Sequence, residues 1–198
     1  MALSILILAA GRHEADDTSP IYLAEQNGDT ILEQILKKFL GLSPKDVAIC
    51  FLKPDIQRFN VDRAAKLMCP DIKIFEIEGD TGGSGCTALF GACQLPPKNE
   101  LMIVSANELI KIALEPALTD FRRRGLDGAT FTFHSTNPRY SFVSIDKKFF
   151  LFLFLFNIII FISSSLNPYP DLMLKGFGYI RFLFLYFVLL IFLINTDF

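Results

Sequence analysis

The chain has 198 residues, a formal net charge of −2 and four cysteines. This length is enough for one domain with a buried core, and the near-neutral charge argues against a nucleic-acid-binding surface. The cysteines show neither CxxC pairs nor the spacing of a metal finger, so reduced thiols in a cytoplasmic protein are expected.

The chain starts with a short apolar run that ends in small residues. LSILIL at residues 3–8 is followed by Ala9, Ala10 and Gly11, which predicts a strand buried on both faces and then a tight turn. A secretory signal is the weaker interpretation, because no positive residue precedes the apolar run. The sequence leaves open whether the turn is only a turn or a loop that holds a nucleotide.

Strand and helix patterns then alternate along the chain. Asp29 and Thr30 precede apolar residues at helical spacing, which predicts a capped helix that ends near Gly41. The later patterns predict strands at 47–52, 72–77 and 101–104, helices at 54–68, 87–95 and 110–123, and two β-rich runs at 129–135 and 140–146. Strands separated by helices of this length indicate an α/β fold, Rossmann-like, with a largely parallel sheet flanked by helices.

Three loops are expected to meet at one edge of this sheet. Parallel strands joined by right-handed crossovers place their carboxyl ends along one edge, where open α/β sheets bind their ligands. The loops that leave these ends are AAGRHEADD (9–17), GDTGGSG (79–85) and SANE (105–108).

Each of these loops has a functional and a structural interpretation. Gly11 lets the backbone approach a phosphate whose charge Arg12 neutralises, or it only serves a tight turn. The glycine-rich loop presents N–H groups at a helix start to an anion or a base, or it is a flexible linker with Cys86 as a small packing residue. Asn107 and Glu108 are suited to hold a divalent cation, or they cap the following helix.

His134 and Arg139 lie on either side of the turn at Asn137-Pro138. A lone histidine is more often structural than catalytic. The pair is a candidate for a functional site.

Five segments occur in a characteristic order along the chain: ILILAAGR, SPIYLAEQNGDTILEQIL, TGGSGCTALF, LMIVSANELI and FTFHSTNPRYSFVSID. Together they resemble the sugar-nucleotide pyrophosphorylase family, whose members are nucleotidyltransferases with a glycosyltransferase-A-like fold. The resemblance covers about residues 3–147, and its specificity comes from the order of the segments. It is closest to a divergent branch associated with capsule or surface-polysaccharide genes.

The resemblance implies a reaction and a set of site residues. A sugar 1-phosphate oxygen attacks the α-phosphate of a nucleoside triphosphate, with Mg²⁺ assisting, and pyrophosphate leaves. Arg12 would act near the phosphates as the catalytic cation, and Asn107 with Glu108 would occupy the metal position. The implied nucleotide-binding residues are Leu8, Ala9, Ala10, Gly11, Gly83, Ser84, Gly85 and Cys86.

The sequence departs from the family pattern at the phosphate end. The segment HEADD at 13–17 places carboxylates where a triphosphate would lie, and like charges repel. Ile21 stands where the family has a lysine, and Asn107 stands where it has an aspartate. These departures favour a second hypothesis, a non-catalytic nucleotide- or sugar-binding module.

The last segment has a different composition. Residues 149–198 hold 12 of the 21 phenylalanines, so we divide the chain into a nucleotidyltransferase-like unit at 1–148 and an apolar tail at 149–198. The preferred explanation of the tail is a frameshift, a read-through or a gene-model error, which would leave the catalytic domain incomplete. Its apolar runs at 149–162 and 182–194 are shorter than the ~20 residues that span a bilayer, although a membrane hairpin would make this a membrane-associated glycan-assembly protein. Buried strands are the less favoured interpretation of such uniform runs.

Overall fold

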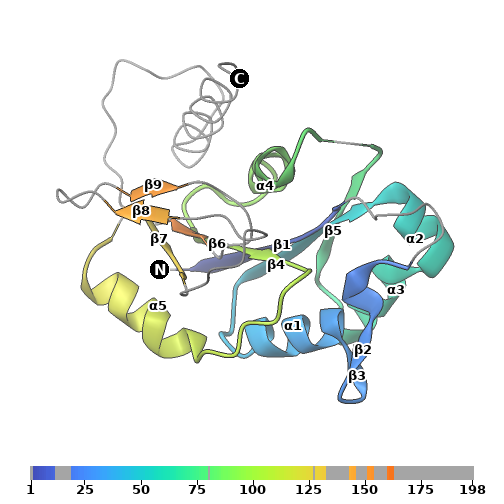
Figure 1. The fold of residues 1–198 in the computed structure, drawn as a ribbon, viewed down its shortest axis with the longest axis horizontal. Coiled ribbons are helices and arrows are strands. Elements are labelled where there is room, and N and C mark those ends of the chain that lie inside the picture. The colour runs from blue at the N-terminus through green and yellow to red at the C-terminus, as the bar shows by residue number, and fades with distance from the viewer. Residues whose placement is uncertain are drawn as a thin grey trace.

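The computed structural model describes residues 2–11, 19–79, 81–126 and 128–132, and the backbone of three short strands at 143–145, 151–153 and 160–162. One sheet forms the middle layer of the molecule (Figure 1). Helix α4 covers one face of it, and α1, α3 and α5 cover the other. The proposed boundary at residue 148 and the end of the tail at 163–198 lie outside the described residues.

The main sheet is largely parallel, as the sequence predicts. Strand β1 pairs in parallel with β4 and with β6, and β4 pairs in parallel with β5. Strand β10 is antiparallel to both of its neighbours, β6 and β7. In spatial order the strands are β5 (Lys73–Ile77), β4 (Asp46–Leu52), β1 (Leu3–Ala9), β6 (Glu100–Ser105), β10 (Ile160–Ile162) and β7 (Gly128–Thr130).

Strand β10 corrects the expectation that the apolar tail is unsuited to strands. Ile160 pairs with Ile103 of β6 on one side and with Thr130 of β7 on the other. A strand between two others reads as an uninterrupted apolar run, so uniform hydrophobicity does not argue against it. Two smaller pairs complete the strands: β2 (Glu25–Gln26) with β3 (Asp29–Thr30), and β8 (Val143–Ile145) with β9 (Leu151–Leu153).

The described helices are the 3₁₀ helix η1 (Ile21–Leu23), α1 (Ile31–Leu40), α2 (Lys53–Phe59), α3 (Val61–Met68), α4 (Ser84–Ala92) and α5 (Leu114–Arg123). Helix α1 begins with a capping box, in which the Glu33 N–H donates to Thr30 Oγ1 and the Thr30 N–H donates to Glu33 Oε2. This confirms the cap predicted at Asp29-Thr30.

Three helix boundaries differ from the sequence prediction. The single helix expected at 54–68 is broken at Asn60, whose φ of 50° is left-handed. Helix α4 starts at Ser84, three residues before the expected Thr87. Helix α5 starts at Leu114 instead of residue 110. Pro116 explains this late start, because proline has no N–H to donate and is tolerated only in the first turn.

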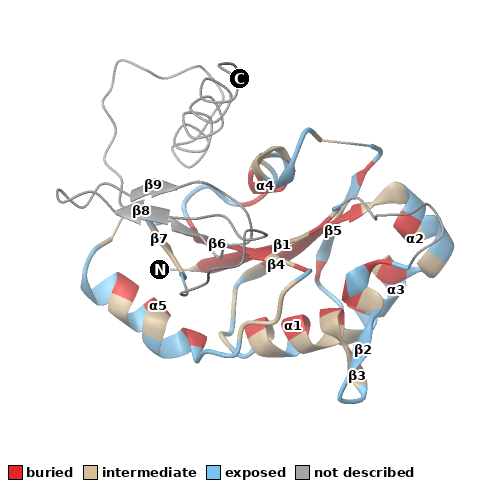
Figure 2. Ribbon diagram, in the orientation of Figure 1, coloured by how far each residue is buried: buried red, intermediate tan, exposed pale blue. Residues whose placement is uncertain are grey.

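The side chains of β1 alternate between two cores, and the strand is coloured as mostly buried in Figure 2. Ile5, Ile7 and Ala9 lie in the larger core under α1, α3 and α5, whereas Leu6 lies in the smaller core under α4. All four are nearly inaccessible to solvent. The first strand is therefore buried on both faces, as its uninterrupted apolar run predicts. Within the described part of the chain, no helix is long and apolar enough to cross a membrane.

Cys50 lies in the core under α4, and its burial has a chemical consequence. Desolvation raises the pKa of the Cys50 thiol to about 12, and only the thiolate reacts. We therefore expect iodoacetamide at pH 8 to leave Cys50 unmodified in the native protein, while the half-buried Cys69, Cys86 and Cys93 react. Peptide mass spectrometry measures the labelling. The denatured protein is the control, in which all four cysteines should react at similar rates, and native labelling of Cys50 at that rate would contradict the buried position.

Candidate functional site

The strand order places a topological switch point between β1 and β6. The chain passes from β1 to β4 and then to β5 on one side of β1, and it returns to β6 on the other side. At such a point the loops that leave the two central strands run in opposite directions and open a crevice at the carboxyl edge of the sheet. The loops concerned follow Ala9 and Ser105.

These two loops begin side by side. The N–H of Ala106 donates to the carbonyl oxygen of Leu8 at 2.9 Å, which extends the β1–β6 pairing by one residue. A Cβ atom built on Gly11 would lie 3.6 Å from the Nδ2 atom of Asn107. The structure thus brings together Gly11 and Asn107, which are far apart in the sequence. Both residues are exposed.

The candidate residues of β1 divide between the two faces of the sheet. Leu8 and Ala10 are partly buried against the core under α4, which also contains Ala88. Ala9 points to the opposite core and is 2% exposed, so it can offer a ligand only its backbone. Leu8 and Ala10 therefore lie on the same face as the helix that follows the glycine-rich loop.

The glycine-rich loop turns into α4 through two left-handed residues. Gly82 has a φ of 79° and Gly83 a φ of 129°, a region that side chains rarely adopt. Gly83 is the N-cap residue of α4, and its carbonyl accepts from the N–H groups of Cys86 and Thr87. The N–H groups of Ser84 and Gly85, in the first turn, have no acceptor within the helix. These groups are available to an anion or to the edge of a base.

Two threonines that the sequence analysis did not single out hold this loop. The Thr81 and Thr87 hydroxyls lie 2.6 Å apart, and each also lies within hydrogen-bond distance of the Gly83 carbonyl oxygen, at 3.1 Å and 3.3 Å. A hydroxyl has one proton, so one threonine donates to the other, which in turn donates to Gly83. Thr87 is buried on α4, so it ties the loop to a packed helix. A pair of threonines flanking a glycine run is the signal that could have found them.

In the loop after β6, the residue Asn107 is exposed and Glu108 is partly buried. The Asn107 N–H donates to Ser105 Oγ at 3.3 Å, and its side chain is exposed. Burial raises the pKa of the Glu108 carboxyl above its ordinary value. The alternative that these two residues cap the next helix is wrong, because α5 begins only at Leu114 with Ala113 at its N-cap.

The oxygen ligands at this edge of the sheet suit a metal ion that is already partly coordinated by a nucleotide. Among the described residues, no group of three or more His, Cys, Asp or Glu side chains could hold a metal ion. Mg²⁺ is commonly bound through one or two carboxylates, with phosphate oxygens and waters completing its shell. The oxygens of Asn107 and Glu108 fit that partial role for a metal carried by a nucleotide, and they do not form a preformed protein cage.

The loop that leaves β1 returns to the body of the protein at Pro20–Leu23. Ile21 is 55% exposed at this return, while Tyr22 is buried beneath it. The remaining predicted site residues, Arg12, His134 and Arg139, lie outside the described residues.

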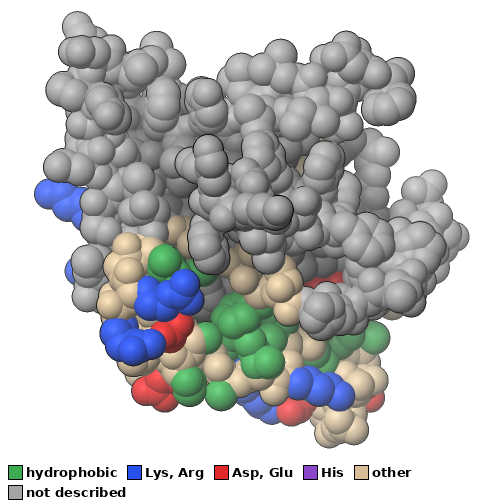
Figure 3. All heavy atoms as spheres, turned by 60° about the vertical axis from the view of Figure 1, so that its left-hand side comes forward, with side chains coloured by type: hydrophobic (Ala, Val, Ile, Leu, Met, Phe, Trp, Pro, Cys, Tyr) green, Lys and Arg blue, Asp and Glu red, His purple; other side chains and the backbone are tan. Residues whose placement is uncertain are grey.

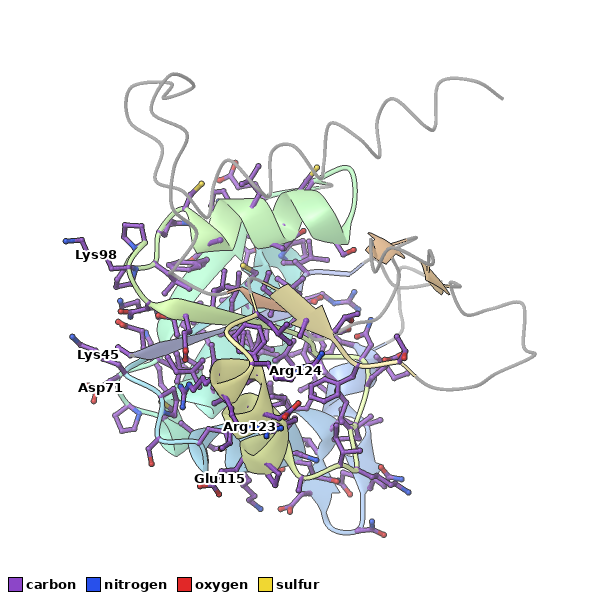
Figure 4. The ribbon with its side chains drawn as sticks, turned by 90° about the vertical axis from the view of Figure 1, so that its left-hand side faces the viewer. Lys45, Asp71, Lys98, Glu115, Arg123 and Arg124 are labelled. Carbon is purple, nitrogen blue, oxygen red and sulfur yellow. The ribbon has the colours of Figure 1, made fainter. Side chains whose placement is uncertain are left out.

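The opposite edge of the sheet has a different character. Lys45, Asp71 and Lys98 precede β4, β5 and β6, and they lie at one side of the molecule in Figure 4. The face around α5 mixes basic, acidic and apolar side chains (Figure 3). There Asp120 pairs with Arg123 at 2.5 Å and with Arg124 at 3.5 Å. Neither surface gathers the loops of the switch point.

Comparison with known proteins supports the fold and stops short of a family assignment. No protein-family model matches the chain, and no curated protein matches its sequence. Solved structures do match, at low identity. A protein assigned as a glucose-1-phosphate thymidylyltransferase from Bacillus anthracis, in complex with sucrose, has a TM-score of 0.65 at 12% identity over 84% of this chain and 76% of its own.

Two further structures give the same result. HddC from Yersinia pseudotuberculosis has a TM-score of 0.59 at 12% identity over 81% of this chain and 76% of its own, and it has also been solved with GMP-PN. A 4-diphosphocytidyl-2C-methyl-D-erythritol synthase from Anaerococcus prevotii has a TM-score of 0.56 at 14% identity over 83% of this chain and 71% of its own. The α/β, Rossmann-like fold predicted from the sequence is thereby confirmed.

Proposed function

We propose that this chain transfers a nucleoside monophosphate from a nucleoside triphosphate to a sugar 1-phosphate and releases pyrophosphate. The observation that carries the proposal is the proximity of Gly11 and the Asn107 side chain at the switch point of the sheet, where a Cβ atom built on Gly11 would lie 3.6 Å from Asn107 Nδ2. Structural neighbours of this chain are named as nucleotidyltransferases or bind a nucleotide analogue. These names support the same general kind of reaction.

In this proposal the backbone does most of the nucleotide binding. Leu8 and Ala10 flank the crevice on the α4 face, and Ala9 and Gly11 contribute backbone without bulk. Gly83, Ser84, Gly85 and Cys86 receive the base or the sugar at the start of α4. Backbone N–H groups held in a fixed loop are effective because they need no reorganisation when the ligand arrives.

The charges of the triphosphate need partners. Arg12 is proposed to neutralise the phosphates, and His134 with Arg139 to contact the sugar phosphate. Asn107 and Glu108 would hold a nucleotide-borne Mg²⁺, which offsets phosphate charge when it is bound. The raised pKa of Glu108 means that its carboxyl ionises less readily than an exposed one, so a cation beside it would favour the ionised form.

The proposed reaction needs little covalent or acid–base chemistry from the side chains. An oxygen of the sugar phosphate forms a bond to the α-phosphorus, and the bond from that phosphorus to the pyrophosphate oxygen breaks. The protein contributes by aligning the attacking oxygen and by neutralising charge as it develops. Ile21 is neutral where the resemblance implies a lysine, so the protein supplies less positive charge than this chemistry favours, and the amide of Asn107 is a weaker metal ligand than a carboxylate.

The proposal is tested by measuring pyrophosphate release by the full chain with Mg²⁺, the four common nucleoside triphosphates and a panel of sugar 1-phosphates. Release that requires both substrates and gives a nucleotide-sugar by mass spectrometry is the expected result. Release from a triphosphate alone would indicate hydrolysis and contradict the transfer reaction. Binding of Mg²⁺-nucleotide without turnover would instead favour the non-catalytic module, for which the neutral Ile21 and Asn107 argue.

A further inference from the structure

A lysine of α1 holds the segment that connects β6 to α5, residues 106–113. The Lys38 ammonium group donates to the carbonyl oxygen of Ile110, across 72 residues of sequence. In Figure 1 this connecting segment runs beside α1 on its way to α5. Near its start it carries Asn107 and Glu108, the two candidate metal ligands. The hydrogen bond therefore ties α1 to the part of the chain that would hold the metal.

The connecting segment has few other anchors. At its start, the Ala106 N–H donates to the Leu8 carbonyl oxygen. Further along, the side chains of Leu109 and Ile110 pack against the larger core. Within the described part of the chain, the bond to the Ile110 carbonyl is the one hydrogen bond that residues 108–112 make. A half-buried carbonyl needs such a donor, and here a side chain from another element supplies it.

The environment of Lys38 differs from that of the neighbouring lysine. Lys37 is exposed and forms an ion pair with Asp29 at 2.5 Å. Lys38 is half-buried, desolvation lowers its pKa, and its partner is a neutral carbonyl. Both lysines lie in the last turn of α1, where a positive charge is favoured by the helix dipole. What distinguishes Lys38 is therefore its bond to the connecting segment.

Residues 107–109 are held between two fixed points. Ala106 is tied to β1 at one end, and Ile110 is tied to α1 at the other. Without the second tie, Asn107 and Glu108 would be fixed by hydrogen bonds at one end alone. Groups that orient metal ligands affect metal affinity although they do not touch the metal.

We propose that Lys38 is a positioning residue, which holds the connecting segment so that Asn107 and Glu108 can bind the Mg²⁺ carried by the nucleotide. This inference rests on the proposed function for its ligand. Lys38 acts through the backbone at Ile110 and does not have to touch either the metal or the nucleotide.

Three substitutions in the last turn of α1 separate positioning from the loss of a charge. Lys38→Met removes the donor and keeps an unbranched side chain. Lys37→Met is the matched control, because it removes the same charge from the same turn and breaks only the surface ion pair with Asp29. Lys38→Arg keeps a donor and should bind like the wild type. Unfolding temperatures are measured first, and binding is compared where every variant is folded.

The metal dependence of nucleotide binding decides the matter. Calorimetry on the full chain gives the dissociation constants of ATP, GTP, CTP and UTP, once with Mg²⁺ and once with EDTA. We expect Lys38→Met to weaken binding of the Mg²⁺ complex about tenfold, the lower end of the range for residues that orient metal ligands, and to leave metal-free binding unchanged. An unchanged ratio of the two constants in Lys38→Met, or an equal change in Lys37→Met, would overturn the inference.

A second measurement keeps this test separate from that of the proposed function. If the wild-type chain binds none of the four nucleotides, the proposed function fails, and trypsin cleavage after the exposed Lys111 then tests the anchor alone. Cleavage of a folded segment requires that it opens, so its rate reports how firmly the segment is held. Mass spectrometry identifies the fragment that ends at Lys111. Faster cleavage there in Lys38→Met than in the wild type and Lys37→Met supports the anchor, and equal rates overturn it.

Discussion

Gly11→Val is expected to weaken binding of Mg²⁺-nucleotide more than about a hundredfold, because it fills the space between the loops after β1 and β6. A Cβ at this position already lies 3.6 Å from Asn107 Nδ2, which is ordinary van der Waals contact. The two further methyl groups of valine have to occupy the crevice that the phosphates would enter. Gly11 is not among the glycines with positive φ, so the expected effect comes from space and not from backbone strain.

The variant Gly11→Ala separates the effect of occupied space from that of backbone strain. Its single methyl group fits beside Asn107, so the unfolding temperature should stay at the wild-type value while nucleotide affinity falls by a smaller factor than in Gly11→Val. Ala64→Val, at an exposed position of α3, is the control for adding the same side chain elsewhere and should leave affinity unchanged. Calorimetric titration measures all three variants. Wild-type affinity in Gly11→Val would show that the loop after β1 is not the nucleotide site.

The parallel core of the sheet was predictable because its signals are local. Strands β1, β4 and β6 are buried on both faces, so each appears in the sequence as a short apolar run bounded by turn residues. The helices between them fix the parallel direction. The order of the loops at the carboxyl edge follows from these two facts.

The elements that differ from the sequence prediction are those in which tertiary contacts outweigh the local sequence pattern. The left-handed Asn60 lies within a segment whose apolar spacing reads as one helix. Ser84 and Gly85 are weak helix formers, so the pattern placed the start of α4 too late. Strand β10 depends on pairing with β6 and β7, and its apolar run does not by itself distinguish a buried strand from another apolar segment.

The residues of the candidate site also divide into those that the sequence predicts and those that it does not. The sequence could name Gly11, the glycine-rich loop and Asn107, because each follows a predicted strand. The threonine pair Thr81 and Thr87 also had a local signal, because the two residues flank the glycine run. The buried hydrogen bond from Tyr22 to Asp55 had none, because the two residues are 33 positions apart and a single side-chain hydrogen bond has no periodic pattern.

The second large effect is expected at Gly91, because this residue determines how closely α4 packs against the sheet. A Cβ built on Gly91 would lie 2.6 Å and 2.9 Å from the two Cδ atoms of Leu6, and 3.0 Å from Cys50 Sγ. These atoms belong to central strands that are buried on both sides, so they have little room to move. We expect Gly91→Val to lower the free energy of unfolding by about 3 kcal/mol, the upper part of the range for overpacked cores. Urea denaturation followed by circular dichroism measures the change.

The contact with Leu6 can be tested separately. Gly91→Ala should destabilise less than Gly91→Val, because alanine adds one methyl group and favours the helix. In the double variant L6V/G91A the shorter side chain at position 6 has no Cδ atom, so the combined loss of stability should be smaller than the sum of the two single losses. Additive losses would mean that Gly91 and Leu6 are not in contact. Because α4 starts at the glycine-rich loop, Gly91→Val should also weaken nucleotide binding at temperatures where the variant is still folded.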